Sequence, residues 1–205
     1  MRNLLIVFFL FVASLAQAQN FKAETEQHRI KYKEDFITNE HSPLKEADLK
    51  YLNFFDADSS YKVRAKVKLL SNEKPFKMPT YAGTTAEYVK YAVLSMQVHN
   101  QPVQLTLYKN VALSQNPVYR DYLFLPFTDQ TNNKETYGGG RYMDLKTSDI
   151  VKDKIEIDFN KAYNPYCAYS DGYRCPIPPE ENDLSLAIKA GEKKYSGEKK
   201  KRDLK

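Results

Sequence analysis

The sequence predicts a mainly β, α+β fold: a single-domain antiparallel β-barrel or sandwich with one or two N-terminal helices. Short segments in which apolar and polar residues alternate recur from Tyr61 onward, as expected of strands that bury one face. Turn residues separate these segments at hairpin spacing. No long helical pattern lies between them, which argues against a parallel sheet with crossover helices.

The first residues have the pattern of an export signal. Arg2 precedes an apolar run, Leu4–Leu15, and a small-x-small cleavage motif ends at Ala18. The run is shorter than the roughly twenty residues of a membrane span, although a single membrane anchor is the alternative. With residues 1–18 as a signal peptide cleaved after Ala18, the mature chain begins at Gln19. We therefore expect a secreted or periplasmic protein that is not an integral membrane protein.

Two helices are expected before the strands. Phe21–Asn39 is rich in Glu, Lys and Gln and lacks Gly and Pro, which favours a helix. Its thin apolar face, formed by Ile30 with Ile37 and by Tyr32 with Phe36, suits a helix on the outside of a domain. Ser42-Pro43 is typical of a helix start and predicts a second, short helix that ends near Asn53.

The strands follow from the alternating pattern. In Tyr61–Leu70 the odd-numbered positions from Val63 to Leu69 are apolar and the even-numbered positions from Lys62 to Lys68 are basic, which indicates a strand with one wet face. The other predicted strands are Pro75–Met78, Glu87–Val98, Val103–Tyr108 (after a turn at His99–Pro102), Tyr122–Phe127, Arg141–Leu145, Lys154–Phe159 and Leu184–Ile188.

Residues 19–191 are expected to form one domain, because no repeat and no Ser/Gly linker interrupts them. The chain carries 31 Lys and Arg against 26 Asp and Glu, a formal charge of +5. Most of the excess lies in residues 192–205, which we predict to be a basic, disordered tail. Nucleic-acid binding requires basic residues clustered on a folded face, so this distribution argues against a nucleic-acid partner.

Both cysteines, Cys167 and Cys175, lie in one loop. In an oxidising compartment this spacing favours a disulfide, which would contribute about 2–3 kcal/mol by constraining the unfolded chain. A metal site with two further ligands and a redox pair are the alternatives, although the Cys-x-x-Cys spacing of redox pairs is absent.

Gly, Pro, Asn, Tyr and Cys concentrate between Leu123 and Pro179. The glycines Gly138–Gly140 let backbone amides approach an anion, or simply form a turn or bulge. If the strands pair as hairpins, polar residues at their ends converge and suit a ligand pocket; the same residues also suit loop-fixing roles. The ligand-binding candidates are Tyr137, Gly138, Gly140, Arg141, Tyr142, Asn160, Asn164, Tyr166 and Asn182.

Four carboxylates are candidates for general acid/base chemistry: Asp129, Glu135, Asp158 and Glu181. In a hydrolase, Arg141 would hold the anionic part of the substrate. The three histidines are scattered, and zinc-hydrolase, nucleophile-elbow and phosphate-loop signatures are absent from the sequence. We therefore predict no metal and no cofactor, and whether the protein is an enzyme stays open.

Four motifs in this stretch resemble the family called domain of unknown function 1684 (DUF1684). They are FLPFTDQT at Phe124–Thr131, ETYGGGRY at Glu135–Tyr142, DFNKAYNPYCAY at Asp158–Tyr169, and CPIPPEEN at Cys175–Asn182, followed by Ala190–Lys193. Asn132-Asn133 departs from the family, which often has Gly after the Thr. The resemblance implies no reaction, because the family has no assigned activity.

The sequence thus predicts a secreted or periplasmic protein that binds a small polar ligand or envelope component in a pocket built from residues 124–182. Two alternatives remain open. One is a hydrolase that uses a carboxylate pair with Arg141, and the other is a structural or partner-binding protein in which these motifs only stabilise the fold.

Overall fold

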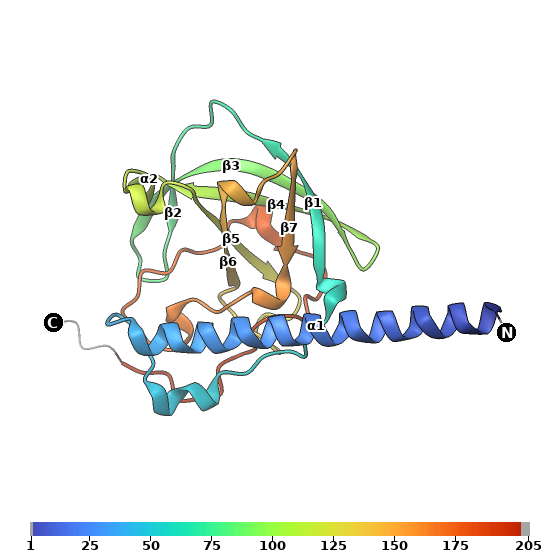
Figure 1. Ribbon diagram of the computed structural model, residues 1–205. Helices are drawn as coiled ribbons and strands as arrows, with labels where there is room; N and C mark the ends of the chain where they lie inside the picture. The colour runs from blue at the N-terminus through green and yellow to red at the C-terminus, as the bar shows by residue number, and fades with distance from the viewer. Residues whose placement is uncertain (1, 202–205) are drawn as a thin grey trace.

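The computed structural model describes the backbone of residues 2–201 and the side chains of residues 19–201. A mostly antiparallel sheet of eight strands curls into a half-barrel, and a long N-terminal helix, α1 (Arg2–Thr38), runs across one side of it (Figure 1). The predicted fold class, a β-rich single domain with an N-terminal helix, is confirmed. The expected signal peptide, residues 1–18, lies outside the described side chains.

The strands follow the order β6-β5-β4-β3-β1-β7, with β2 paired to β3 and β8 paired in parallel to β5. Their bounds are β1 Lys62–Leu69, β2 Phe76–Pro79, β3 Thr85–Val98, β4 Gln101–Asn110, β5 Tyr122–Asp129, β6 Arg141–Lys146, β7 Lys154–Asp158 and β8 Asp183–Leu184. Each predicted strand is present. The last is shorter than predicted, because only its first residues pair with β5.

The hairpin between β3 and β4 turns where the sequence predicts it. His99 (φ 47°) and Asn100 (φ 63°) both adopt the left-handed conformation, which matches the right-handed twist of the flanking strands in a two-residue turn. Val98 then pairs with Gln101. This turn sets the register of the longest hairpin in the sheet.

The concave side of the sheet holds the main core, which strands β1, β3, β4, β5, β6 and β7 all supply. β5 is buried on both faces: Leu125 and Phe127 enter the main core, whereas Phe124 packs in a second cluster with Tyr142 on the other face. In β1 the expected alternation ends early, because Leu69 at the strand end is 60% exposed.

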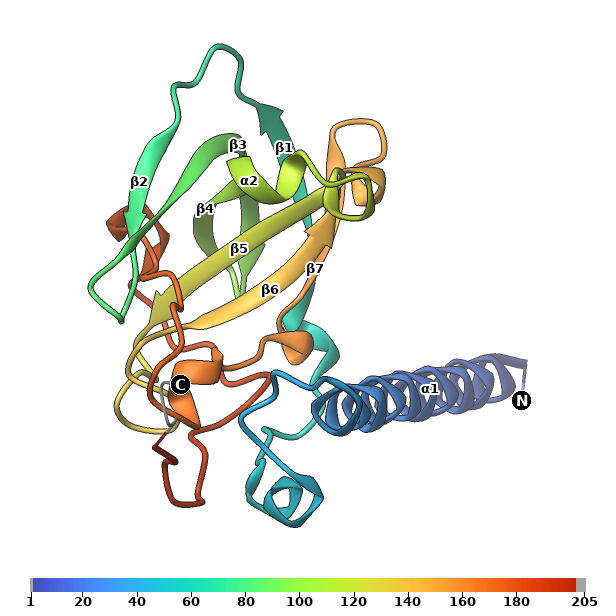
Figure 2. The ribbon, with the colours of Figure 1, turned by 90° about the vertical axis from the view of Figure 1, so that its left-hand side faces the viewer.

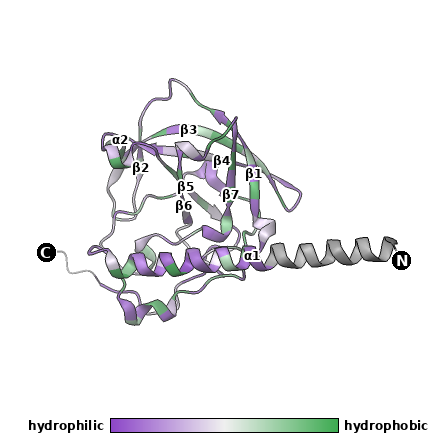
Figure 3. Cartoon of the chain, viewed as in Figure 1, coloured by the Kyte–Doolittle hydropathy of each residue, from purple (hydrophilic) through white to green (hydrophobic). Residues whose placement is uncertain are grey.

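The packing face of α1 differs from the expected one. Ile30 and Ile37 are exposed, whereas Thr25 and Phe36 are buried and Tyr32 is half-buried. The aromatic pair decides the orientation, because rings bury more apolar area than the two isoleucines. Polar and apolar residues alternate along the described part of α1 (Figure 3). Within the described side chains, no helix is both long and apolar enough to span a membrane.

The remaining helices are short. The second predicted helix is a single 3₁₀ segment, Glu46–Tyr51, because Ser42 uses its hydroxyl to accept a hydrogen bond from Leu44 N instead of capping a longer helix. α2 is Val111–Ser114. Further 3₁₀ turns are Ser59–Tyr61, Pro117–Tyr119, Thr147–Asp149, Phe159–Lys161, Tyr166–Ala168 and Glu180–Asn182.

The segment expected to be a disordered tail packs against the domain through Lys200. Its backbone amides donate to carbonyls of earlier residues, Lys193 N to Asn53 O (2.8 Å) and Lys200 N to Tyr169 O (2.8 Å). Tyr195 is buried in a third cluster that includes Phe36. The run of lysines predicted disorder, but the tyrosine ring and the backbone pairing stabilise the segment.

We expect Tyr195→Ala to lower the free energy of unfolding by about 2–4 kcal/mol, because it removes a buried aromatic side chain. Lys194→Ala, at the exposed neighbouring position, is the control and should change stability by less than about 0.5 kcal/mol. Urea denaturation measures both. Equal, small effects would mean that residues 192–200 are as mobile as their charge suggests.

Candidate functional site

Arg141 and Asp129, both candidates from the sequence, form an ion pair inside the protein. Arg141 Nη2 lies 2.7 Å from Asp129 Oδ2, and neither side chain has more than 1% of its surface exposed. The guanidinium also donates to the carbonyls of Ile188 (2.8 Å) and Ala190. Burial lowers the pKa of Arg141, and Asp129 opposes this shift. The guanidinium therefore holds the C-terminal segment against the sheet and has no exposed surface.

The carboxylate of Asp129 also accepts several hydrogen bonds within the protein. Its Oδ1 accepts hydrogen bonds from Thr131 N (2.8 Å), Thr131 Oγ1 (2.6 Å) and Ile188 N (3.2 Å). The carboxylate therefore orders the loop that follows β5 and fixes the same C-terminal segment that Arg141 binds.

The asparagines from the motifs also bind backbone groups. Asn182 Oδ1 accepts from Thr106 N (2.7 Å), and its Nδ2 donates to Thr106 O and Pro126 O, so it joins β4 to β5. Asn160 exchanges two hydrogen bonds with the backbone of Asp58. Both side chains are buried within the protein, and their amides are used in holding separate segments together.

The triple-glycine loop makes close backbone contacts. Gly140 has φ +84°, and a Cβ there would lie 2.6 Å from Phe127 O, so only glycine fits without strain. Tyr81 donates its hydroxyl to Gly139 O (3.0 Å), and Tyr137 is near Cys167 O. These contacts are those of a packed turn.

The four candidate carboxylates have separate surroundings. Asp129 pairs with Arg141, and Glu135 lies 3.1 Å from Lys189. Glu181 contacts Lys90 Nζ (2.6 Å) and accepts from the hydroxyl of Tyr108, and Asp158 accepts from Asn160 N and Nδ2. None of the four is hydrogen-bonded to another within the described residues. Each carboxylate therefore stabilises its own local feature, and these contacts do not join any two of the four into an acid/base pair.

Cys167 and Cys175 form a disulfide, with Cα atoms 6.2 Å apart. It closes the loop that precedes the Cys175–Asn182 motif. Cys167 belongs to the second core cluster, next to Tyr142 and Tyr166. The bond therefore lies close to a large concavity, which Cys175 lines.

That concavity is a cleft of about 1290 Å³ between α1 on one side and β6, β7 and residues 161–176 on the other. Figure 2 shows α1 beneath β6 and β7. Of the sequence candidates, Tyr142, Asp158, Tyr166 and Cys175 line this cleft. The others do not: Asp129, Glu135, Tyr137, Gly138, Gly140, Arg141, Asn160, Asn164, Cys167, Glu181 and Asn182.

The cleft wall carries a carboxylate that is not one of the four acid/base candidates. Asp144 lies on β6, and its Oδ1 accepts hydrogen bonds from the hydroxyls of Tyr122 and Tyr163, each at 2.7 Å. The side chain of Asp144 is exposed to solvent, and it lies between the walls of the cleft. Burial raises the pKa of Asp144, and the two hydrogen bonds oppose the shift. Period-two alternation predicts that Asp144 faces away from the main core, but it does not reveal what covers that face.

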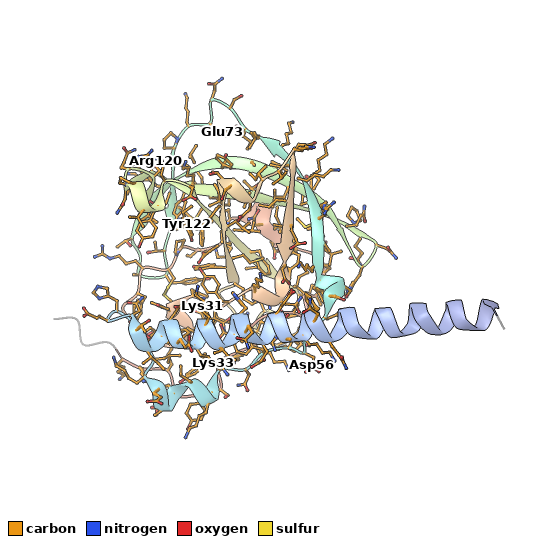
Figure 4. All side chains as sticks on the ribbon, in the orientation of Figure 1. Lys31, Lys33, Asp56, Glu73, Arg120 and Tyr122 are labelled. Atoms are coloured by element: carbon orange, nitrogen blue, oxygen red, sulfur yellow. A yellow bond between two sulfur atoms is a disulfide. The ribbon has the colours of Figure 1, made fainter. Side chains whose placement is uncertain are left out.

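One wall of the cleft is formed by α1, and none of the site candidates predicted from the sequence lies on this helix. His28, Lys31, Tyr32 and Asp35 line it from the helix, and burial lowers the pKa of His28, helped by nearby Lys161. Lys31 on α1 and Tyr122 on the sheet are labelled in Figure 4. No short motif marks the helix residues, since their contacts are with residues far along the chain.

A buried acid lies behind the same wall. Glu192 accepts hydrogen bonds from the hydroxyls of Tyr32 (2.9 Å) and Tyr169 (2.7 Å) and from Asn164 N (2.8 Å). It has no exposed surface, and burial raises its pKa to about 7 against those hydrogen bonds. Asn164 also donates from Nδ2 to Lys193 O (2.8 Å). Glu192 thus joins α1 to the C-terminal segment.

Arg141→Leu should lower the free energy of unfolding by about 3–5 kcal/mol, because it leaves Asp129 buried without its cation. The control is Lys189→Leu, which removes a cation from an exposed ion pair and should cost less than about 1 kcal/mol. Chemical denaturation compares the two. A loss as small as the control's would refute the structural role of Arg141.

Glu192 should make stability depend on pH. The folded state binds this proton more tightly than the unfolded chain, so the contribution of Glu192 to the free energy of unfolding is greatest below about pH 4.5 and is lost as the pH rises through about 7. A shift of this size corresponds to on the order of 3 kcal/mol. Glu192→Gln should lose this pH dependence, whereas Glu181→Gln should keep it. Melting temperatures measured from pH 5 to pH 8 compare the three proteins, and a fall of equal size in Glu192→Gln would contradict the assignment.

Comparison with known proteins agrees with the sequence motifs. No curated protein matches the chain. A solved structure does: the solution structure of an uncharacterised protein from Haloarcula marismortui, with 31% identity and a TM-score of 0.66 over 87% of this chain and 96% of that one. The family model described as a protein of unknown function, DUF1684, matches residues 47–193. The chain therefore belongs to the DUF1684 family.

Proposed function

We propose that the protein binds a small polar ligand in the cleft between α1 and the sheet. The observation that supports this is the convergence of polar and aromatic side chains from three distant segments on one concavity of about 1290 Å³. Such a concavity is large enough for a small molecule, and binding sites of this kind combine apolar walls with a few placed polar groups.

The lining favours a polar ligand. Tyr142, Tyr163 and Tyr166 supply aromatic walls, and charged side chains of both signs stand among them. A tyrosine ring offers an apolar face with a polar tip. The site overlaps the pocket predicted at residues 124–182 only in part, because α1 supplies one whole wall.

We also propose that the protein is secreted or periplasmic, with residues 1–18 removed as a signal peptide. The apolar run with its small-x-small motif supports this, and so does the Cys167–Cys175 disulfide, since such bonds persist in oxidising compartments. An envelope component is then a plausible source of the ligand.

Export predicts a defined mature end. N-terminal sequencing of the protein from its native compartment should give Gln19 as the first residue. Ala18→Leu, which spoils the small-x-small motif, should retain the precursor mass. A mature protein that still begins at Met1 would contradict export by this signal.

Ligand binding is tested by filling the cleft. Asp35 lines the cleft from α1, whereas Glu34 precedes it on the exposed helix surface and does not. Native mass spectrometry of the wild-type protein mixed with a small-molecule extract of its own compartment should show an added mass. Asp35→Trp should lose that mass and Glu34→Trp should keep it. An identical spectrum for both variants would contradict binding in this cleft.

A further inference from the structure

We propose that Asp144, with Tyr122 and Tyr163, forms a subsite that binds an organic ammonium group. The inference rests on the proposed function and names the chemical class of the ligand. It starts from a carboxylate that is exposed in the cleft and has no cationic partner among the described residues.

Asp144 lacks a counterion inside the protein. Among residues 19–201, no lysine, arginine or histidine nitrogen lies within 4.0 Å of its carboxylate. Among the described residues, the groups that donate hydrogen bonds to this carboxylate are the hydroxyls of Tyr122 and Tyr163. The side chain of Asp144 is exposed in the cleft, so a cation that enters the cleft can reach its carboxylate.

The hydrogen bonds leave one oxygen free. Both tyrosine hydroxyls donate to Asp144 Oδ1, and no described group donates to Oδ2. A carboxylate offers about four acceptor positions, so Oδ2 can accept from an N–H group or lie against a quaternary ammonium. Because Tyr122 and Tyr163 hold Oδ1 from two different segments, the carboxylate is fixed in place before any ligand arrives.

Aromatic rings surround this position. Asp144 pairs across the strands with Phe124. Tyr142 lies 4.8 Å from Phe124 and 6.0 Å from Tyr163, measured between ring centroids. The faces of such rings, together with a carboxylate, are the groups that recognise organic cations. Anions are disfavoured by Asp144, and one carboxylate with two phenols supplies fewer oxygens than the six to eight that Ca²⁺ takes.

The charge of the whole cleft agrees with this choice. Five carboxylates line it against three lysine or arginine side chains, although the chain carries a formal charge of +5. The carboxylates are Asp35, Asp144, Asp149, Glu156 and Asp158, and the cations are Lys31, Lys161 and Arg174. A concave surface with excess negative charge raises the local concentration of cations.

The test uses choline, ethanolamine and 3,3-dimethylbutan-1-ol, which has the shape of choline without its charge. Isothermal titration calorimetry on the full mature chain should show binding of at least one of the two ammonium compounds. The neutral alcohol should bind at least tenfold more weakly than choline. Asp144→Asn should weaken ammonium binding at least tenfold, and Tyr122→Phe should weaken it by a smaller factor.

Glu156→Gln is the matched control, because it removes one negative charge from the cleft lining without touching Asp144. It should change affinity less than about threefold. The inference is overturned if choline and the neutral alcohol bind equally, if neither ammonium compound binds, if Ca²⁺ alone binds, or if Asp144→Asn and Glu156→Gln behave alike. A polyol or carboxylate that binds wild type but not Asp35→Trp would overturn the ammonium class and leave the proposed cleft function standing.

Discussion

The buried pair of Arg141 and Asp129 is the interaction on which much of the structure depends. It connects the ends of β5 and β6 to the C-terminal segment through three backbone carbonyls and one amide. Desolvating two charges is expensive, and hydrogen bonds to the remaining donors and acceptors offset that cost. The pair therefore requires the loop after β5 and residues 188–192 to be in place together.

The cleft depends on this framework. Residues 188–192 end with Glu192, whose carboxylate holds Tyr32 of α1 and Tyr169. Gly191 has φ +79°, and a Cβ there would lie 2.6 Å from Ala162 O. The chain therefore passes close to residues 161–176, which line the cleft opposite α1. One continuous set of polar contacts thus runs from the centre of the sheet to the helix that forms the cleft wall.

The sequence predicted the strands well because alternation with period two is a local signal, visible in Tyr61–Leu70 without any knowledge of neighbours. It indicated few of the residues that line the cleft. Dense motifs mark residues that hold loops, such as Asn182 and Arg141, because irregular backbone needs buried polar partners. Asp144 and Tyr32 meet the cleft through contacts between distant segments, and no local pattern encodes them. The lysines around Tyr195 likewise predicted a disordered tail, although the ring of Tyr195 is buried.

The contact between Tyr32 and Glu192 joins an early part of the chain to a late one. During synthesis α1 is made long before Glu192, its buried partner. Arg141 likewise binds carbonyls of residues 188–192, which are made later than Arg141 itself. These contacts cannot form until residues 188–192 are present, and such long-range contacts slow folding. These late contacts would leave α1 undocked until residue 192 has been made, which would suit the export that we propose.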